Sequence, residues 1–281
     1  MEELRQIITL AQLPEVDGRY LLELYEKLQA EPAHFEAFCG LKAAYLAGDE
    51  CVEPRKRLAR STGIHPFTLD LLLLLCCFCA LRKTYAQKGL SEELFVESLA
   101  DVRYKLEECR MVYGICGNFV FHWYRGFFDC TRFKLGRLQF EPHEMKNDYR
   151  DVLKTGDMIY RCHIPMAGSL TPEMVQDSIK QAYEFYKPEG ALYIHCSSWL
   201  LFPEHYALYP EGSNLRKFYD LFDIYASKLS PDSSNSWRVF GTMEKRPDCL
   251  PGDNSLRRAF REYLRAGKVM GSGSGVITYW P

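Results

Sequence analysis

The spacing of apolar residues changes along the chain, and this change constrains the fold more than any other feature. Up to about residue 115, apolar side chains recur every three or four residues, as in an amphipathic helix. From about residue 135 the repeat is two, which is typical of strands. We expect an α+β protein, with a helical domain at 1–117 and a mixed domain at 118–281. The clearest helical stripe has Ser91 as its N-cap, Gly114 as its stop, and Phe95, Leu99, Val102, Leu106, Cys109 and Tyr113 as its members.

Three further segments of the first half fit a helical bundle. Apolar stripes at 21–28 and 35–45 predict two helices, and the apolar run LDLLLLLCCFCAL at 69–81 predicts a buried one. That run contains Asp70 and is followed by Arg82 and Lys83, so it falls short of the roughly 20 residues of a membrane span. An aromatic helix at 118–130 is expected to join the two domains.

Composition argues against several classes of partner. The 35 Lys and Arg residues are balanced by 37 acidic ones, for a net charge of -2, so nucleic acid is not an expected partner. The N-terminus does not resemble a secretory signal. The eleven cysteines are an odd number and three of them crowd at 76–79, which favours a reducing, cytoplasmic setting. We expect no membrane partner and no metal, because no set of four ligands occurs at zinc spacing.

The second half predicts alternating strands and helices. A helix is expected after Thr171, with Pro172 at its first position; a second follows Ser213 or Asn214, and a third runs from Asp253 or Asn254 to Gly267. The polar loop 229–236 separates the last two of the strands that we expect in this domain. The glycine-rich segment 269–280 is interpreted as a hairpin, because a phosphate-binding loop would lead into a helix. The five strands are expected at 134–142, 157–165, 191–201, 222–227 and 237–242.

This order of elements, together with several phrases, resembles a bacterial family of acyltransferases. The family has a helical N-acyltransferase N-terminal domain and a GNAT-like C-terminal domain. The resemblance implies a mixed α/β domain with a central, mostly antiparallel sheet, and transfer of an acyl group from acetyl-CoA or another acyl-CoA to a small-molecule or peptide amine. The phrases that carry it are GRLQFEP, HIPMAGSLTPE, SSWLLFPEH, PEGSNLRKF and LRRAFREYLRAGK.

The resemblance also points to a cofactor-binding loop. In GNAT enzymes the loop between the fourth strand and the third helix holds the pyrophosphate of acyl-CoA with backbone amides and the positive helix end. Gly168 would allow close approach, and Ser169 and Thr171 would add hydroxyl donors. The family pattern has a basic or amide residue and two glycines, whereas this loop has one glycine. The implied cofactor-binding residues are Ile164, Met166, Ala167, Gly168, Ser169, Leu170 and Thr171.

Direct acyl transfer needs a base for the amine and an acid for the leaving thiolate. If the strands at 134–142 and 157–165 pair, Arg137, Gln139 and Glu141 share a face with Arg161 and His163. We expect Glu141 or His163 to be the base. Tyr219 is the candidate acid, because GNAT enzymes often place a tyrosine on the corresponding helix. The residues expected at the substrate are Arg137, Gln139, Ser197 and Trp199; ordinary packing and ion pairing are the alternative for each candidate.

Two other functions stay open at this stage. The single glycine of the loop favours a binding or regulatory module that has kept the fold and lost catalysis. A hydrolase with Cys196 as nucleophile is the third alternative. Its neighbour His195 should point to the opposite face of the strand, so this alternative needs another base.

Overall fold

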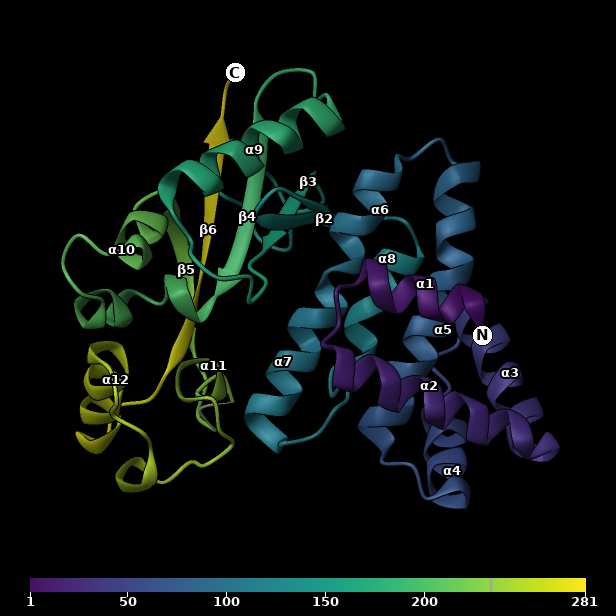
Figure 1. The fold of residues 1–281 in the computed structure, drawn as a ribbon. Helices are drawn as coiled ribbons and strands as arrows, with labels where there is room; N and C mark the ends of the chain where they lie inside the picture. The colour runs from purple at the N-terminus through teal and green to yellow at the C-terminus, as the bar shows by residue number, and fades with distance from the viewer. Residues whose placement is uncertain (233) are drawn as a thin grey trace. The chain divides into compact units, whose positions relative to one another are not determined.

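The computed structural model describes residues 1–232 and 234–281, so the expected loop at 229–236 is described except for Ser233, which lies outside the described residues. The chain divides into two compact units, Met1–Phe133 and Lys134–Pro281 (Figure 1). Residues 118–133 group with the first unit by their contacts. The sequence-based boundary after residue 117 stays a prediction.

The first unit is helical and is built around one buried helix, α5. The predicted buried segment is confirmed: Leu71 to Leu75 are fully buried, and α5 contacts α1, α3, α4, α6 and α7. No single helix among the described residues is long and apolar enough to cross a membrane, and only α4 and α5, a pair bent by 114°, reach that length and composition together. The elements are α1 (Glu2–Leu10), α2 (Glu15–Ala30), α3 (Pro32–Leu46), α4 (Val52–Thr62), α5 (Pro66–Gln87), α6 (Glu92–Leu99), α7 (Asp101–Tyr113), the 3-10 helix η1 (Phe121–Tyr124) and α8 (Arg125–Phe128).

Two of the predicted helices are shorter than expected. The Ser91 cap and the left-handed Gly114 stop are confirmed, but the helix between them is interrupted at Ala100, which separates α6 from α7. The helix expected at 118–130 is reduced to η1 and α8. Its first residues are held out of helical geometry because the Asn118 side chain accepts a hydrogen bond from the Val120 amide at 2.9 Å.

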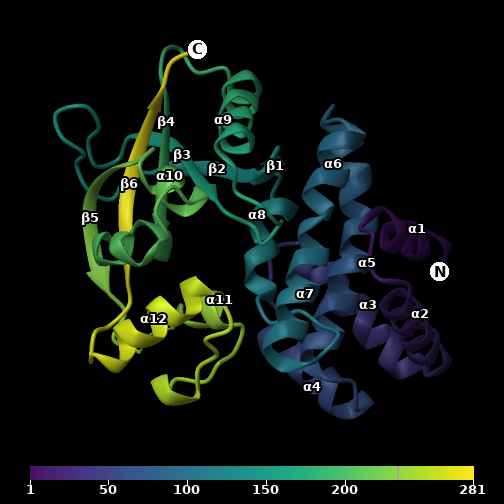
Figure 2. The same ribbon diagram turned by 60° about the vertical axis from the view of Figure 1, so that its left-hand side comes forward.

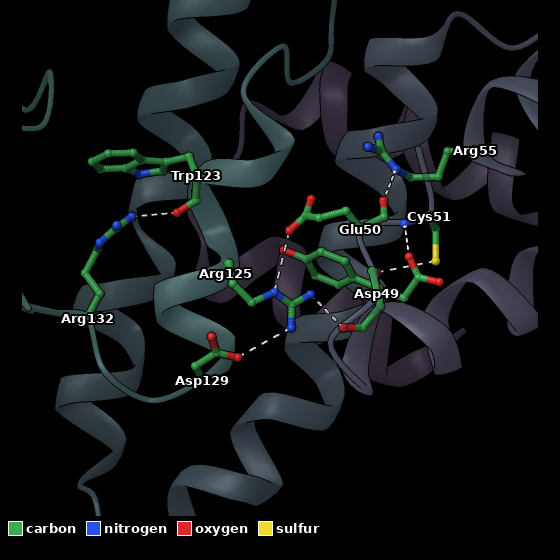
Figure 3. Close-up of polar contacts among 9 residues, drawn as sticks. Asp49, Glu50, Cys51, Arg55, Trp123, Arg125, Asp129 and Arg132 are labelled. Atoms are coloured by element: carbon green, nitrogen blue, oxygen red, sulfur yellow. Dashed lines mark hydrogen bonds and ion pairs between the residues drawn. The ribbon is translucent and has the colours of Figure 1, made fainter. Parts of the chain in front are cut away.

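Polar contacts hold α8 within the first unit. Arg125 donates to the carbonyl oxygen of Tyr45, at the end of α3, at 2.7 Å. It also lies 3.6 Å from the Glu50 carboxylate, between α3 and α4, and 3.5 Å from Asp129 (Figure 3). The Arg125 guanidinium stacks over the Tyr45 ring as well, at 4.1 Å from its centroid. These contacts explain why residues after 117 group with the helical unit.

The second unit is a mixed, mostly antiparallel sheet with flanking helices. Among the described residues the sheet has six strands in the order β1-β2-β3-β4-β6-β5 (Figure 2). β3 and β4 are parallel, whereas the pairs β2/β3, β4/β6 and β5/β6 are antiparallel. The elements are β1 (Phe133–Leu135), β2 (Leu138–Glu144), β3 (Met158–His163), α9 (Pro172–Tyr186), β4 (Leu192–Ser198), η2 (Trp199–Leu201), η3 (Pro203–Leu208), α10 (Asn214–Tyr219), β5 (Asp223–Leu229), α11 (Trp237–Phe240), η4 (Pro247–Cys249), α12 (Ser255–Arg265) and β6 (Gly271–Tyr279).

Different segments of the chain pack against the two faces of the sheet. Helix α9 lies against one face, where Tyr186 stacks on Tyr160 with ring centroids 3.9 Å apart and donates to the Phe140 carbonyl oxygen at 3.2 Å. The loop between β2 and β3 lies on the other side (Figure 2). Its apolar residues form a cluster with part of the second face of the sheet, and this cluster consists of Met145, Tyr149, Leu153, Ile159 and Val276.

One predicted strand and the predicted hairpin were wrong in form. Residues 237–240 form the single-turn helix α11, where Trp237, Val239 and Phe240 are all buried. The segment 269–280 is not a hairpin but contains one long strand, β6, which runs between β4 and β5 (Figure 1). Its glycines serve close packing rather than a turn, because a Cβ atom on Gly273 would lie 1.8 Å from the Leu201 carbonyl oxygen.

The remaining predictions for this unit are largely confirmed. The side chains of Thr171, Ser213 and Asn254 cap α9, α10 and α12 as expected. The strand expected at 134–142 is divided at Gly136, which adopts a φ of +63° in the turn from β1 to β2.

Candidate active site

A polar cluster lies on the sheet face opposite α9. The register pairs Gln139 with His163 and Glu141 with Arg161, so alternate residues of β2 and β3 share this face as predicted. His163 Nε2 and Glu141 Oε1 are 2.7 Å apart. Their side chains are 17% and 16% exposed, so both are sheltered without being sealed from solvent. The two candidate bases therefore form one hydrogen-bonded pair.

Two further histidines extend this cluster, and neither was predicted from the sequence to belong to the site. Arg161 Nη2 donates to His143 Nε2 at 3.3 Å, and the His143 ring stacks on His195 with centroids 4.6 Å apart. Burial, reinforced by nearby Arg161, lowers the pKa of His143 to about 4. Burial, with His143 next in importance, lowers the pKa of His195 to about 3. Both rings are therefore neutral at pH 7. The available sequence signal was the spacing of two between Glu141 and His143 on β2; for His195 it was only its place on the next strand, where it pairs with Arg161.

The loop from Ile164 to Thr171 connects β3 to the N-terminus of α9. Ala167 donates its amide to the Pro165 carbonyl oxygen at 2.8 Å. Within the described part of the chain, the amides of Gly168, Ser169 and Leu170 donate to no backbone or side-chain acceptor. Gly168 has a φ of +78°, and a Cβ there would meet nothing within 4 Å. The middle of the loop is thus open and offers amide donors beside the positive end of α9.

Arg137, which was predicted to share the polar face with Gln139 and Glu141, lies outside the strand that carries these two residues. It lies in the turn between β1 and β2, before the alternation of β2 begins. Its side chain crosses to the loop and donates to three carbonyl oxygens, those of Pro165, Gly168 and Ser169. Arg137 is only 6% exposed, so its contacts are with its own chain.

The loop and the polar cluster occur at neighbouring ends of two strands. β3 and β4 are parallel and pair only at Tyr160 with Ile194 and at Arg161 with His195. Beyond this point β3 leads into the loop, whereas β4 continues along β6 as far as Ser198. The carboxyl end of β3 therefore joins His163, which bonds to Glu141 of β2, to the loop with the available amides.

Of the other predicted site residues, Gln139 lies on the polar face opposite His163, whereas Tyr219 and Trp199 lie on other elements of the second unit. Tyr219 is on α10 and contacts Tyr206, with ring centroids 4.9 Å apart; no described contact joins it to Glu141 or His163. Burial raises the pKa of Tyr219. Trp199 is in η2 and packs against Phe260 at 5.7 Å. Ser197 is exposed on β4 and accepts a hydrogen bond from Ser274, and Gln139 is fully buried.

Cys196 is placed poorly for nucleophilic catalysis. It is 1% exposed and lies on the face of β4 opposite His195, as expected from the alternation of the strand. A hydrogen bond to Cys196 is the main cause that raises the pKa of Cys162, and burial adds to it. Among the described residues, no group of three or more His, Cys, Asp and Glu side chains could hold a metal ion.

Comparison with known proteins defines the class of this fold. The GNAT-like C-terminal domain matches residues 133–277, and the N-acyltransferase N-terminal domain matches residues 2–130. The chain belongs to this family of GNAT-like acyltransferases. No curated protein matches the chain.

Solved structures agree with this assignment at the level of the fold. One is an acyltransferase in complex with decanoyl-CoA and teicoplanin, with 23% identity and a TM-score of 0.80 over 99% of this chain and 88% of that one. Another is an acyltransferase mutant in complex with octanoyl-CoA, with 22% identity and a TM-score of 0.80 over 100% of this chain and 88% of that one. At these identities the similarity establishes a shared architecture.

Proposed function

We propose that this protein is an acyl-CoA-dependent N-acyltransferase that acylates a small-molecule or peptide amine. The observation that carries the proposal is the loop at 164–171, whose amides at Gly168, Ser169 and Leu170 are available beside the N-terminus of α9. Such amides suit a diphosphate, and every acyl-CoA carries one. Similar structures that hold decanoyl-CoA or octanoyl-CoA support this choice of donor.

The acceptor is proposed from the same comparisons. One of the similar structures holds teicoplanin together with decanoyl-CoA, which favours a peptide-like amine for this chain as well. The unpaired cysteines are consistent with a reducing compartment, and we propose a cytoplasmic bacterial protein.

The chemistry requires no covalent intermediate on the protein. The amine nitrogen attacks the thioester carbonyl carbon, a C–N bond forms, and the Glu141–His163 pair accepts the proton that the amine loses. The C–S bond then breaks and CoA leaves as a thiolate that needs a proton. Tyr219 is the proposed donor, because a phenol carries its proton at neutral pH. Gln139, Ser197 and Trp199 are proposed to border the substrate.

Thermal unfolding with free CoA, acetyl-CoA and decanoyl-CoA tests the donor directly. A ligand that binds only the folded state raises the melting temperature, by about 5 °C when its concentration is about 100 times its Kd. Thiol release on mixing decanoyl-CoA with a panel of peptide amines then tests transfer. Binding without release for every amine favours a regulatory module, and no shift with any of the three ligands contradicts the proposal.

A further inference from the structure

We propose that Arg137 is a positioning residue that shapes the diphosphate-binding loop from outside that loop. The inference rests on the proposed function, since it assigns a role within the acyl-CoA site. It also accounts for the departure of this loop from the family pattern, in which a basic or amide residue and two glycines belong to the loop itself.

The contacts of Arg137 reach along the whole middle of the loop. Its Nε donates to the Ser169 carbonyl oxygen at 2.8 Å, its Nη1 to that of Pro165 at 2.9 Å, and its Nη2 to that of Gly168 at 3.0 Å. A guanidinium presents its N–H donors in a rigid planar fork. Three carbonyl groups held by one such fork have little freedom to reorient.

Arg137 is itself fixed at its backbone. Its amide and that of Leu138 both donate to Ser178 Oγ, at 2.6 and 3.2 Å, and the Ser178 hydroxyl donates to the Met174 carbonyl oxygen in the first turn of α9. Gly136 permits this approach, because a Cβ there would lie 2.8 Å from Ser178 Oγ. The turn that carries Arg137 is therefore held against the same helix whose N-terminus follows the loop.

The consequence for the loop amides follows from the planar trans peptide. In each peptide unit the carbonyl of one residue and the amide of the next point in opposite directions. The carbonyl groups of Gly168 and Ser169 are directed at Arg137, so the amides of Ser169 and Leu170 are directed away from it. The hydrogen bonds of Arg137 thus hold these carbonyl groups toward its side chain and leave the amides facing away from it. The positive charge of Arg137 adds to the attraction for an anion.

The test compares binding of decanoyl-CoA with binding of decanoyl-S-pantetheine, which keeps the acyl chain and thioester but lacks the diphosphate and the 3′-phosphoadenosine attached to it. Isothermal titration is applied to the wild type and to Arg137→Gln and Arg137→Lys. We expect Arg137→Gln to raise the Kd for decanoyl-CoA about tenfold or more, with less than a twofold change for decanoyl-S-pantetheine. The Kd of Arg137→Lys for decanoyl-CoA should lie between those of the wild type and Arg137→Gln, because an ammonium keeps the charge but not the planar fork.

A matched control is Arg257→Gln on α12, which also loses a guanidinium bond to a carbonyl oxygen, that of Val239 at 3.0 Å. It should leave both Kd values unchanged. An equal loss of affinity for the two ligands in both Arg137 variants, or an unchanged affinity for decanoyl-CoA, would overturn the inference. Failure of the wild type to bind decanoyl-CoA would instead overturn the proposed function.

Discussion

The Glu141–His163 pair is where single residues bear most directly on the proposed reaction. A hydrogen bond of 2.7 Å joins a carboxylate and an imidazole on adjacent antiparallel strands, at the edge where β3 ends. Such a pair can take up a proton while the substrate amine attacks. A purely structural ion pair would show the same contact, so kinetic measurements on variants distinguish the catalytic role from the structural one.

Replacing the pair should reduce transfer much more than stability. For Glu141→Gln, which is isosteric, and for His163→Asn, which is smaller but keeps a polar group near the Nδ1 position, we expect kcat to fall about 100-fold or more, since general base catalysis contributes roughly that much. The measurement is thiol release from decanoyl-CoA in the presence of an amine acceptor. The matched control is Glu144→Gln, an exposed carboxylate on the same strand that pairs with Lys146 at 3.2 Å. Unchanged kcat in the Glu141/His163 double variant, with folding preserved, would assign the pair a structural role.

His195 predicts a pH dependence of stability. Its pKa is lowered to about 3 in the folded protein, whereas an unfolded histidine titrates near 6.5. Between these values the unfolded chain binds a proton that the native chain does not, so stability falls as the pH falls below 6.5. From pH 7.5 to pH 5 this one group should cost about 2 kcal/mol of unfolding free energy.

Urea unfolding of the wild type and of His195→Asn at pH 7.5 and pH 5 measures the contribution of His195 to the pH dependence of stability. The variant should lose about 2 kcal/mol less than the wild type over the same interval, whatever its stability at pH 7.5. His122→Asn, which removes an exposed histidine, is the control. Identical pH dependence in wild type and His195→Asn would show that His195 is not held neutral by the fold.

Helices and strands differ in how far their sequence signals determine them. Caps were predicted accurately, because the Ser91 or Thr171 hydroxyl accepts a hydrogen bond from the amide three residues later and needs no distant partner. The single turn of α11 was taken for a strand, since a spacing of two between Trp237 and Val239 fits either form over so few residues. Short elements contain too little periodicity to choose between the two.

Long-range contacts account for the other differences between sequence and structure. The three bonds of Arg137 join it to residues of a loop that follows the next strand, far away in the chain. The sequence identified the Glu141–His163 face because alternation alone defines it. It assigned neither His143 nor His195 to the site, because their stacking depends on the pairing of β4 beside β3.

The close packing of a glycine in β6 leads to a prediction about the stability of the fold. Gly273 faces η2 so closely that a Cβ atom would lie 1.8 Å from the Leu201 carbonyl oxygen and 2.4 Å from its carbon. Backbone atoms cannot move aside as a side chain can, so Gly273→Ala should reduce the unfolding free energy by roughly 3 kcal/mol. The control is Gly40→Ala in α3, where a Cβ meets nothing within 4 Å and helix propensity favours alanine by about 1 kcal/mol. Equal stability of the two variants in urea would exclude close packing as the reason for the glycine.

At the scale of the whole molecule, the question is where the helical unit ends. The family match to the N-terminal domain covers residues 2–130, and the compact unit reaches Phe133. The segment after residue 117 supplies buried aromatic rings to the helical core. Tyr124 packs edge-on against Phe78 of α5 at 6.0 Å, and Phe121 lies 4.6 Å from Tyr45 of α3.

A fragment of residues 1–133 should therefore fold better than a fragment of residues 1–117. The shorter fragment loses the buried side chains of Phe121, Tyr124 and Phe127 and leaves the rings that they cover exposed to water. Each buried aromatic side chain contributes about 2 kcal/mol or more, so the loss is comparable to the whole stability of a small domain. Thermal unfolding followed by circular dichroism should give a cooperative transition for 1–133 and a broad, early one for 1–117. Equal cooperativity and equal melting temperatures would instead place the end of the domain at residue 117, as the sequence alone predicts.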